Sequence, residues 1–257
     1  MTIYETIKDD YLVYSDKSYR KIVQGIIDYN ISNNRSIIKV LEFGGGSGAF
    51  TRFFLEHENC IVDMIDISDN LLSIAGKILE KKGYKNRFRL INATICRELL
   101  EKLNLKQYDI IFAGAFLHHL NKLELRQSLS YLNENLSKGQ IFAAFEPNLI
   151  NPAIYFQYIY ETKFNQSHYD RNEFPLNPYC LIKILKNYKS NKIIFYDVKY
   201  RSVSNIDKRK MILRYGFLGK TVYFIVSRIF SYMYSFLKTS KFKCKYKKDY
   251  FLLITKF

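Results

Sequence analysis

The sequence is poor in cysteine, proline and glycine, with four, four and eleven of these residues in 257. The four cysteines are Cys60, Cys96, Cys180 and Cys244, which lie far apart and form no CxxC pair. This spacing argues against a zinc site and against a disulfide framework. The first twenty residues also lack the apolar run of a secretory signal. We therefore expect a reduced, cytoplasmic protein with no bound metal.

Acidic residues are scarce in the last part of the chain. Residues 201–257 contain 14 Lys and Arg against 2 Asp and Glu, whereas residues 1–200 contain 26 against 22. Most of the net charge of +16 therefore comes from the C-terminal segment. A basic surface for nucleic acid or for an anionic membrane would belong to this segment.

Apolar runs alternate with helix-like segments over the first half of the chain. The strands expected in this half are residues 37–43, 60–66, 87–91, 108–115 and 139–146. Each gap between them has apolar residues at helical spacing. The pattern is typical of an α/β fold with a parallel sheet and crossover helices. Two later strands are expected at residues 192–201 and 249–257, after a helix at 180–188.

The chain divides into three parts by pattern. Residues 1–35 form a helical segment, residues 36–147 form the α/β core, and residues 148–257 complete the sheet. All four prolines fall between residues 147 and 178, which indicates an irregular stretch after the core. Residues 202–248 are a basic and apolar insertion before the last strand.

A glycine cluster follows the first expected strand, in the stretch VLEFGGGSGAF at residues 40–50. Such a turn brings backbone close to a ligand and directs helix N–H groups toward it. A phosphate-binding P-loop is excluded, because no Lys-Ser or Lys-Thr pair follows Gly48. A dinucleotide fingerprint can be traced through Gly44, Gly46 and Ala49, so the glycines alone leave NAD open.

Glu42 favours a cationic ligand over a dinucleotide such as NAD, because a negative charge before the turn repels a pyrophosphate and attracts a cation. Together with Gly44, Gly46 and Gly48 it forms an acid followed by xGxGxG, which resembles the first motif of the class I S-adenosylmethionine-dependent methyltransferases. The resemblance implies a Rossmann-like, seven-stranded sheet with helices on both faces. It also places Gly45 with the other glycines in the cofactor loop.

Further matches to this family occur in the expected order. The resemblance implies that Asp66, which ends the second strand, bonds both ribose hydroxyls and that Ile67 packs on the adenine. After the third strand the family often has Asp and a small residue, where this chain has Asn92 and Ala93. An amide oxygen still accepts a hydrogen bond from the adenine amine. Gly114 permits close approach of the methionine portion.

His118 and His119 follow the fourth strand, at the edge of the implied cofactor site. In some similar O-methyltransferases a histidine at the place of His118 takes the acceptor's proton, and the second histidine supports the loop. The alternative is that both histidines only shape this loop. The family also implies that residues 1–35 fold over the cofactor as a lid.

The acceptor is indicated less directly. Enzymes that methylate base nitrogens carry a D/N-P-P-Y/F motif after the fourth strand, where this chain has AGAF at residues 113–116. Nucleic acid is therefore less favoured, although RNA stays an alternative. EPNLINP at residues 146–152 resembles bacterial methyltransferases that act on envelope sugars, quinones or secondary metabolites, and the domain as a whole resembles types 11 and 12 of the family. This resemblance implies a small-molecule or lipid-linked acceptor. O-methylation is slightly favoured.

The insertion contains an amphipathic stretch at residues 220–238, with a wide apolar face and a basic edge. Residues 212–248 suit an interfacial helix on an anionic membrane, at its inner face. A membrane span is disfavoured, since Arg228 near the middle costs about 2.5 to 3.5 kcal/mol. The alternatives are a cover for the sheet, a homodimer interface, an RNA contact, or the working surface of a non-catalytic adaptor.

Overall fold

The computed structural model describes residues 16–30, 36–152, 154–155, 158, 174, 176–185, 190–196, 228 and 250–257. Among these residues, no helix has the length and apolar character needed to cross a membrane. The insertion predicted at residues 202–248 lies outside the described residues except for Arg228, and so does the first part of the predicted lid.

Seven strands form one sheet in the order β3-β2-β1-β4-β5-β7-β6. Their bounds are β1 Ile38–Phe43, β2 Cys60–Asp66, β3 Phe88–Asn92, β4 Ile110–Gly114, β5 Ile141–Pro147, β6 Ser190–Tyr196 and β7 Tyr250–Lys256. The first five strands are parallel, and β7 runs antiparallel to both β5 and β6. The expected α/β fold with a seven-stranded Rossmann-like sheet is confirmed.

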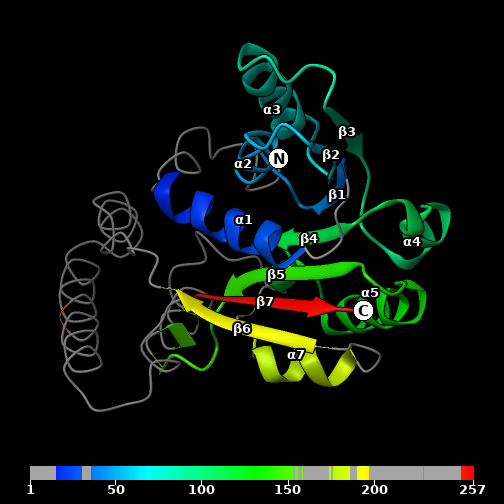
Figure 1. Ribbon diagram of the computed structural model, residues 1–257. Helices are drawn as coiled ribbons and strands as arrows, with labels where there is room; N and C mark the ends of the chain where they lie inside the picture. Colours follow the sequence, from blue (N-terminus) through cyan, green and yellow to red (C-terminus); the bar gives the residue numbers. More distant parts are fainter. Residues whose placement is uncertain are drawn as a thin grey trace.

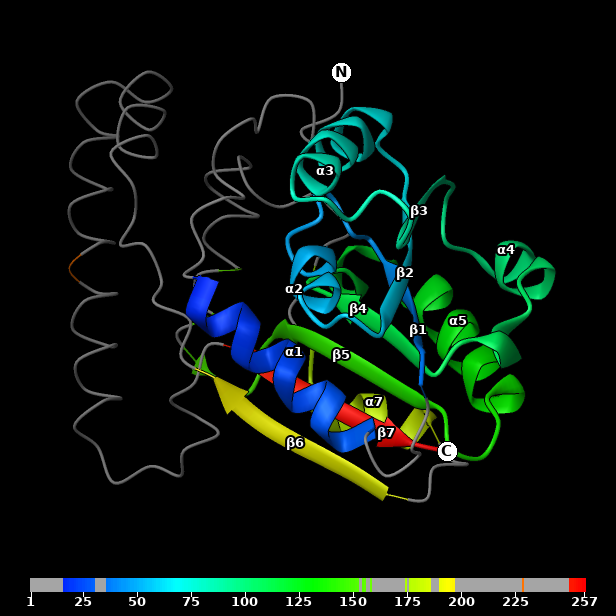
Figure 2. The same ribbon diagram turned by 45° about the horizontal axis from the view of Figure 1, so that its top comes forward.

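Helices cover both faces of this sheet (Figures 1 and 2). They are α1 Asp16–Asn30, α2 Thr51–Leu55, α3 Asp69–Lys81, α4 Arg97–Lys102, α5 Lys122–Asn135 and α7 Pro178–Ile184, with short 3-10 turns η4 Leu105–Gln107 and η5 Leu117–His119. Helices α1, α2 and α3 lie on one side, and α4, α5 and α7 lie on the other. Both faces of the sheet are therefore buried.

Strand alternation assigns side chains to two cores. Val40 of β1 and Phe112 of β4 belong to the core beneath α1 and α2, whereas their neighbours Leu41 and Ile111 belong to the core beneath α4, α5 and α7. This follows from the two-residue period of a strand. It explains why the sequence shows nearly continuous apolar runs instead of alternation with polar residues.

Helix α1 is part of the first core. Ile22, Val23 and Ile26 are fully buried against the sheet and α2. Their spacing of three and four residues places them on one helix face. Of the lid predicted for residues 1–35, the structure describes mainly this helix, and the helix packs as part of the core.

Helix α7 begins two residues before the helix expected at 180–188. The side chain of Asn177 accepts a hydrogen bond from the Tyr179 N–H, and Pro178 occupies the first turn. Asn is a favourable N-cap, and proline is well tolerated at the first helical position because its missing N–H needs no partner there. The cap therefore sets the residue at which this helix begins.

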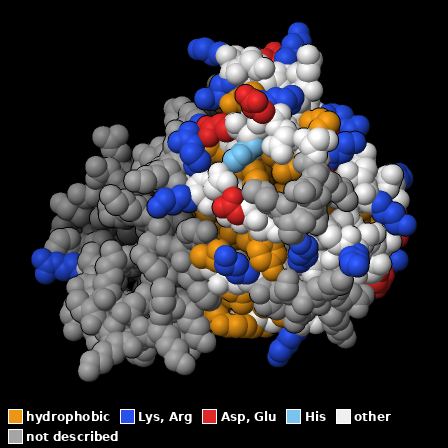
Figure 3. Space-filling view, in the orientation of Figure 1, with side chains coloured by type: hydrophobic (Ala, Val, Ile, Leu, Met, Phe, Trp, Pro, Cys, Tyr) orange, Lys and Arg blue, Asp and Glu red, His pale blue; other side chains and the backbone are white. Residues whose placement is uncertain are grey.

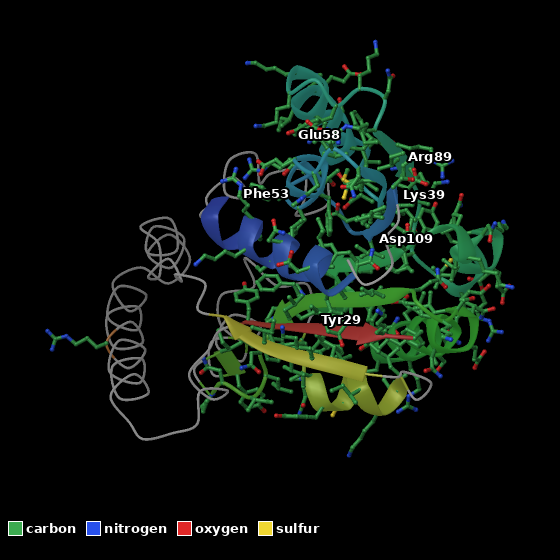
Figure 4. The ribbon with its side chains drawn as sticks, viewed as in Figure 1. Tyr29, Lys39, Phe53, Glu58, Arg89 and Asp109 are labelled. Atoms are coloured by element: carbon green, nitrogen blue, oxygen red, sulfur yellow. The ribbon has the colours of Figure 1, made fainter. Side chains whose placement is uncertain are left out.

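The amino ends of β1 and β4 are tied together by Asp109, which precedes β4. Its carboxylate accepts a hydrogen bond from the Lys39 N–H at 2.9 Å, and its own N–H donates to the Lys39 carbonyl at 2.8 Å. The two residues can be followed in Figure 4. This contact fixes the register of the two strands between which the strand order reverses.

Charged side chains are dispersed over the described surface. On the face that Figure 3 shows, Lys and Arg are scattered among acidic and polar residues, and some of them lie over the hydrophobic side chains in the middle. This agrees with the small net charge of residues 1–200.

Candidate active site

The candidate site lies at the carboxyl edge of the sheet, where β1 and β4 are neighbours. Connections from these two strands lead to opposite sides of the sheet, and such a switch point leaves a crevice for ligands. The loops after the two strands touch each other. A Cβ added to Gly44, which follows β1, would overlap the ring of Phe116, which follows β4.

The glycines of the first loop serve two different purposes. A Cβ at Gly45 would overlap the Met64 side chain, and one at Gly48 would lie 3.3 Å from an α3 side chain, so internal packing disfavours a side chain at both positions. A Cβ added at Gly46 would meet no atom closer than Leu71 Cδ1 at 4.0 Å, and φ is +55°. Gly46 therefore borders open space, in a conformation that suits glycine.

Asp66 joins this loop to the start of α3. Its Oδ2 accepts a hydrogen bond from the Gly46 N–H at 2.8 Å, and its Oδ1 accepts one from the Ser68 N–H at 2.9 Å. A carboxylate has about four acceptor sites, so each oxygen keeps capacity for another donor. Asp66 thus presents two fixed acceptors beside the open side of Gly46.

Three more predicted residues are gathered around Asp66. In the β2–β3 pairing Asn92 is the partner of Asp66. The Asn92 amide donates to the Ile67 carbonyl at 3.0 Å, and the Ala93 N–H donates to the Asp66 carbonyl at 3.1 Å. Ile67 is 65% exposed, so it presents an apolar face to solvent beside these polar groups. The four residues form one surface with an apolar face and acceptors at its edge.

Glu42 is buried beneath the loop. Its side chain is 1% exposed, and the Thr51 hydroxyl donates to its Oε2 at 2.5 Å. Burial raises the pKa of Glu42 to about 8; the Thr51 hydrogen bond opposes this rise, and the Asp66 charge adds to it. The fixed charge inferred from the sequence is therefore a titrating carboxyl, whose ionised form a nearby cation favours.

Gly114 ends β4 in a tightly packed position. A Cβ there would lie 2.7 Å from ring atoms of both Phe112 and Phe50. The close approach of the two rings explains the glycine without a ligand. The next residue, Ala115, has a φ of +54°, a conformation that is uncommon outside glycine. The chain thus turns sharply from β4 into η5.

His118 lies in η5 and is paired with a buried acid. Its Nδ1 lies 2.7 Å from Oε2 of Glu146, the penultimate residue of β5. The other oxygen, Oε1, accepts hydrogen bonds from the N–H groups of Phe116 at 3.0 Å and Leu117 at 2.7 Å. Glu146 is fully buried. Glu146 is not among the residues predicted from the sequence, although an acid in an otherwise apolar strand was a usable signal.

His119 packs on His118 with ring centroids 4.1 Å apart and an interplanar angle of 35°. Only His118 of the two has a hydrogen bond to Glu146. The two histidines therefore differ: His118 contacts a buried carboxylate, and His119 packs against the ring of His118.

A match to a known family covers most of the residues of this site. Residues 41–141 match the family model of a methyltransferase domain. The match runs from β1 to the start of β5 and includes Glu42, the glycine loop, Asp66 and His118. The chain contains a class I S-adenosylmethionine-dependent methyltransferase domain.

Solved structures share the fold of this methyltransferase domain together with its flanking elements. A SAM-dependent methyltransferase from Archaeoglobus fulgidus is 17% identical, with a TM-score of 0.56, 93% of this chain covered and 94% of that chain. An O-methyltransferase family protein from Burkholderia thailandensis is 11% identical, with a TM-score of 0.54 and coverage of 94% and 57%. The cyclase SpnF is 12% identical, with a TM-score of 0.53 and coverage of 94% and 80%. Among curated proteins there is no significant match.

The methyltransferase domain has a donor set that fits S-adenosylmethionine, the cofactor of this family. The cofactor carries no phosphate, and the loop has no lysine placed as in a P-loop. Asp66 offers carboxylate acceptors for a diol, Gly46 borders open space, and Ile67 offers an exposed apolar face. Within the described ranges no group of three His, Cys, Asp or Glu is placed to hold a metal ion.

Proposed function

We propose that this methyltransferase acts on a hydroxyl of a small-molecule or lipid-linked acceptor. When bound, S-adenosylmethionine supplies a methyl group on a positively charged sulfur. The protein then has to align the acceptor with that methyl group and exclude water. A general base is needed only where the attacking atom must lose a proton, as a hydroxyl does.

The cofactor is held by the surface around Asp66. In this proposal the two Asp66 carboxylate oxygens would accept hydrogen bonds from the ribose hydroxyls, and the Ile67 side chain would cover the adenine. The Asn92 side-chain oxygen would accept a hydrogen bond from the adenine amine. The hydrogen bond of Asn92 to the Ile67 carbonyl supports this, because it occupies the amide nitrogen and leaves the oxygen as the acceptor. Gly46 lets the backbone approach the cofactor closely.

Glu42 responds to the cationic end of the cofactor. Its carboxyl is not exposed enough to serve as an open ligand, but it lies directly under the loop. A positive charge near the loop shifts Glu42 toward its ionised form, because opposite charges favour each other in a poorly solvated site.

The observation that carries the proposed chemistry is the place of His118. It follows β4, the strand next to β1, and the contact between Gly44 and Phe116 links its loop to the cofactor loop. A histidine is suited to take up a proton near neutral pH. We therefore assign proton removal from the acceptor to His118 and support of its ring to His119.

The fold by itself does not select the reaction, since the cyclase SpnF shares it. The proposal rests on the residues of the site. RNA methylation and a non-catalytic adaptor are the competing functions, and both are outcomes of the test below.

The test supplies methyl-labelled S-adenosylmethionine and a fractionated cell extract to the full chain. Label in the lipid or small-molecule fraction is expected, and Asp66→Asn should abolish most of it, whereas the exposed neighbour Asp69→Asn should not. Label in RNA alone would overturn the proposed acceptor class. Cofactor binding without label in any fraction would point to the adaptor.

Residues 212–248 are proposed to contact an anionic membrane, which suits a lipid-linked acceptor. The support is the sequence pattern alone, a wide apolar face with a basic edge. The full chain should sediment with vesicles containing anionic lipid at low salt, and less at high salt, but not with zwitterionic vesicles. Failure to sediment with the anionic vesicles would reject the membrane contact.

A further inference from the structure

A half-buried aromatic ring lies where the two loops of the site meet. Phe116 packs against the core beneath α4, α5 and α7, and part of the residue stays accessible to solvent. We propose that the Phe116 ring recognises the positive charge on the sulfur of S-adenosylmethionine and so selects this cofactor over its neutral demethylated product. The inference deepens the proposed function, and it rests on the cofactor placement proposed there around Asp66.

The position of the ring is defined by contacts on the side of β1. A Cβ added to Gly44 would overlap Cβ, Cγ and Cδ2 of Phe116, so the base of the ring touches the backbone of the cofactor loop. The ring of Phe43, the last residue of β1, meets it edge to face with centroids 6.4 Å apart and an interplanar angle of 63°. The Phe116 ring therefore lies at the carboxyl ends of β1 and β4.

Backbone hydrogen bonds hold the ring in this place. The Phe116 N–H donates to Glu146 Oε1 at 3.0 Å, and the Phe116 carbonyl accepts from the His119 N–H at 3.0 Å. Before it, the Ala115 N–H donates to the Phe145 carbonyl at 2.7 Å, with a left-handed φ of +54°. Strained backbone that its surroundings hold so closely is typical of a site where position matters. A ligand meets a ring that is already in place, which lowers the cost of ordering it.

The order of the strands relates this ring to the sulfur. In the proposed placement the ribose and adenine lie at Asp66 and Ile67, after β2, and the acceptor lies beside His118, after β4. Strand β1 lies between β2 and β4 in the sheet. The sulfur is attached to the ribose and its methyl group faces the acceptor, so the sulfur belongs between these two places. The contact between Gly44 and Phe116 lies there.

An aromatic ring suits this charge better than a hydrogen-bonding group. The sulfonium has no N–H or O–H to donate, so an acceptor cannot form an ordinary hydrogen bond to it. The face of an aromatic ring carries partial negative charge and attracts a cation. When the methyl group leaves, the sulfur becomes neutral and this attraction is lost. The cofactor and its product share all their other groups, so the ring distinguishes them by charge.

Two carboxyls of the site are other sources of charge selection. Glu42 is 1% exposed beneath the loop, and Asp66 is bonded to the N–H groups of Gly46 and Ser68 at the ribose end. Their attraction for a cation does not depend on the electrons of the Phe116 ring. A test of the inference must therefore change the charge of the ring face and leave both carboxyls as they are.

The first measurement replaces Phe116 alone with phenylalanines that carry one, two or three ring fluorines, which withdraw charge from the ring face and keep its shape. Calorimetry on the full chain gives the Kd for S-adenosylmethionine and for S-adenosylhomocysteine. The Kd for S-adenosylmethionine should rise with each fluorine, to about 3- to 30-fold in the trifluoro protein, and the Kd for the product should stay within about twofold.

The matched control for this series is Phe88, a half-buried ring at the amino end of β3, the edge of the sheet opposite the site. The same fluorines at Phe88 should change neither Kd by more than about twofold. An S-adenosylmethionine Kd that does not follow the number of fluorines at Phe116, or an equal rise for both ligands, overturns the inference.

The second measurement uses ordinary substitutions. Phe116→Leu removes the ring and keeps an apolar side chain, and it should lower the preference for S-adenosylmethionine over the product by about 3- to 30-fold. Phe116→Tyr keeps a ring face and should retain the wild-type preference within about threefold. Equal weakening of both ligands in Phe116→Leu would assign the ring a packing role and overturn the inference. If Phe116→Leu does not fold, the fluorinated series decides.

Failure of this inference and failure of the proposed function are distinguishable. Asp66→Asn should weaken both ligands alike, because both contain the ribose, whereas the Phe116 variants weaken S-adenosylmethionine alone. If Asp66→Asn weakens neither ligand, the proposed placement of the ribose fails, and the fluorinated series still decides whether the ring recognises the charge. Absence of methyl transfer to every fraction rejects the proposed acceptor class and leaves both binding measurements valid.

Discussion

Glu42 and Glu146 hold the same place in two strands of the sheet, the penultimate residue of β1 and of β5, yet their surroundings differ. Glu42 shares a sheet face with Val40, beneath α1 and α2, whereas Glu146 shares the opposite face with Ala144. One hydroxyl donates to Glu42. Two amides and a histidine ring surround Glu146.

The difference shows that two buried glutamates at the same edge of a sheet can have different properties, depending on their hydrogen-bond donors. Burial with a single neutral donor, next to the charge of Asp66, raises the pKa of Glu42 to about 8, so its charge can follow that of a ligand. Glu146 accepts hydrogen bonds from the backbone of the loop that carries His118, so it holds the shape of that loop. The charge of Glu42 can therefore change when a ligand binds, whereas Glu146 is held in place by its hydrogen bonds.

The largest effect is expected where the loops after β1 and β4 touch. In Gly44→Ala the new methyl group overlaps the Phe116 ring at a φ of +64°. Left-handed backbone and overpacking together should lower the free energy of unfolding by about 2 to 5 kcal/mol, measured by denaturant unfolding. The control is Gly83→Ala, with a φ of +83° and no atom within 4 Å, which should cost only about 1 to 2 kcal/mol. Equal losses in both variants would show that the contact between the loops is unimportant.

The next effect concerns cofactor binding. Asp66→Asn replaces a charged acceptor by a neutral amide and should weaken binding of S-adenosylmethionine by about 10- to 100-fold in calorimetry. Asp69→Asn, three residues further on and exposed, should change the Kd by less than about twofold. If the two variants bind equally well, the ribose hydroxyls are held elsewhere.

A smaller effect tests the titration of Glu42. Its folded pKa, about 8, is above its ordinary value of 4.5, so the protonated form stabilises the folded state. Relative to Glu42→Gln, the wild type should lose stability as pH rises from about 4.5 to about 8, by at most about 1.4 kcal/mol per pH unit. Thermal or denaturant unfolding across this range measures the slope. Parallel curves for both proteins would mean that Glu42 does not titrate there.

The sheet could be predicted because its strands are buried on both faces. Continuous apolar runs predicted β2 with its observed bounds, and β1 starts one residue later than expected, after the exposed Ile37. The grouping of the residues predicted to bind the cofactor could also be anticipated, because parallel strands end at one edge and bring Asp66 next to Asn92.

Two features of the site could not be predicted from the sequence and are seen only in the folded chain. The burial of Glu42 depends on the helix that covers it, and its spacing from the glycines indicates only that an acid precedes the turn. The pairing of His118 with Glu146 joins residues 28 positions apart on different elements. Local pattern carries no information on such a contact, because it depends on how η5 packs against the end of β5.

The smallest effect is expected at Asn92, where this chain departs from the family. Asn92→Asp loses the amide donor to the Ile67 carbonyl, which costs about 1 kcal/mol, and gains a charged acceptor for the adenine amine, which contributes a similar amount. The two terms oppose each other, so the Kd for S-adenosylmethionine should change by less than about fivefold. Asn92→Leu lacks both groups and should bind more weakly than either. Tighter binding in Asn92→Leu would show that the adenine edge meets no acceptor at this position.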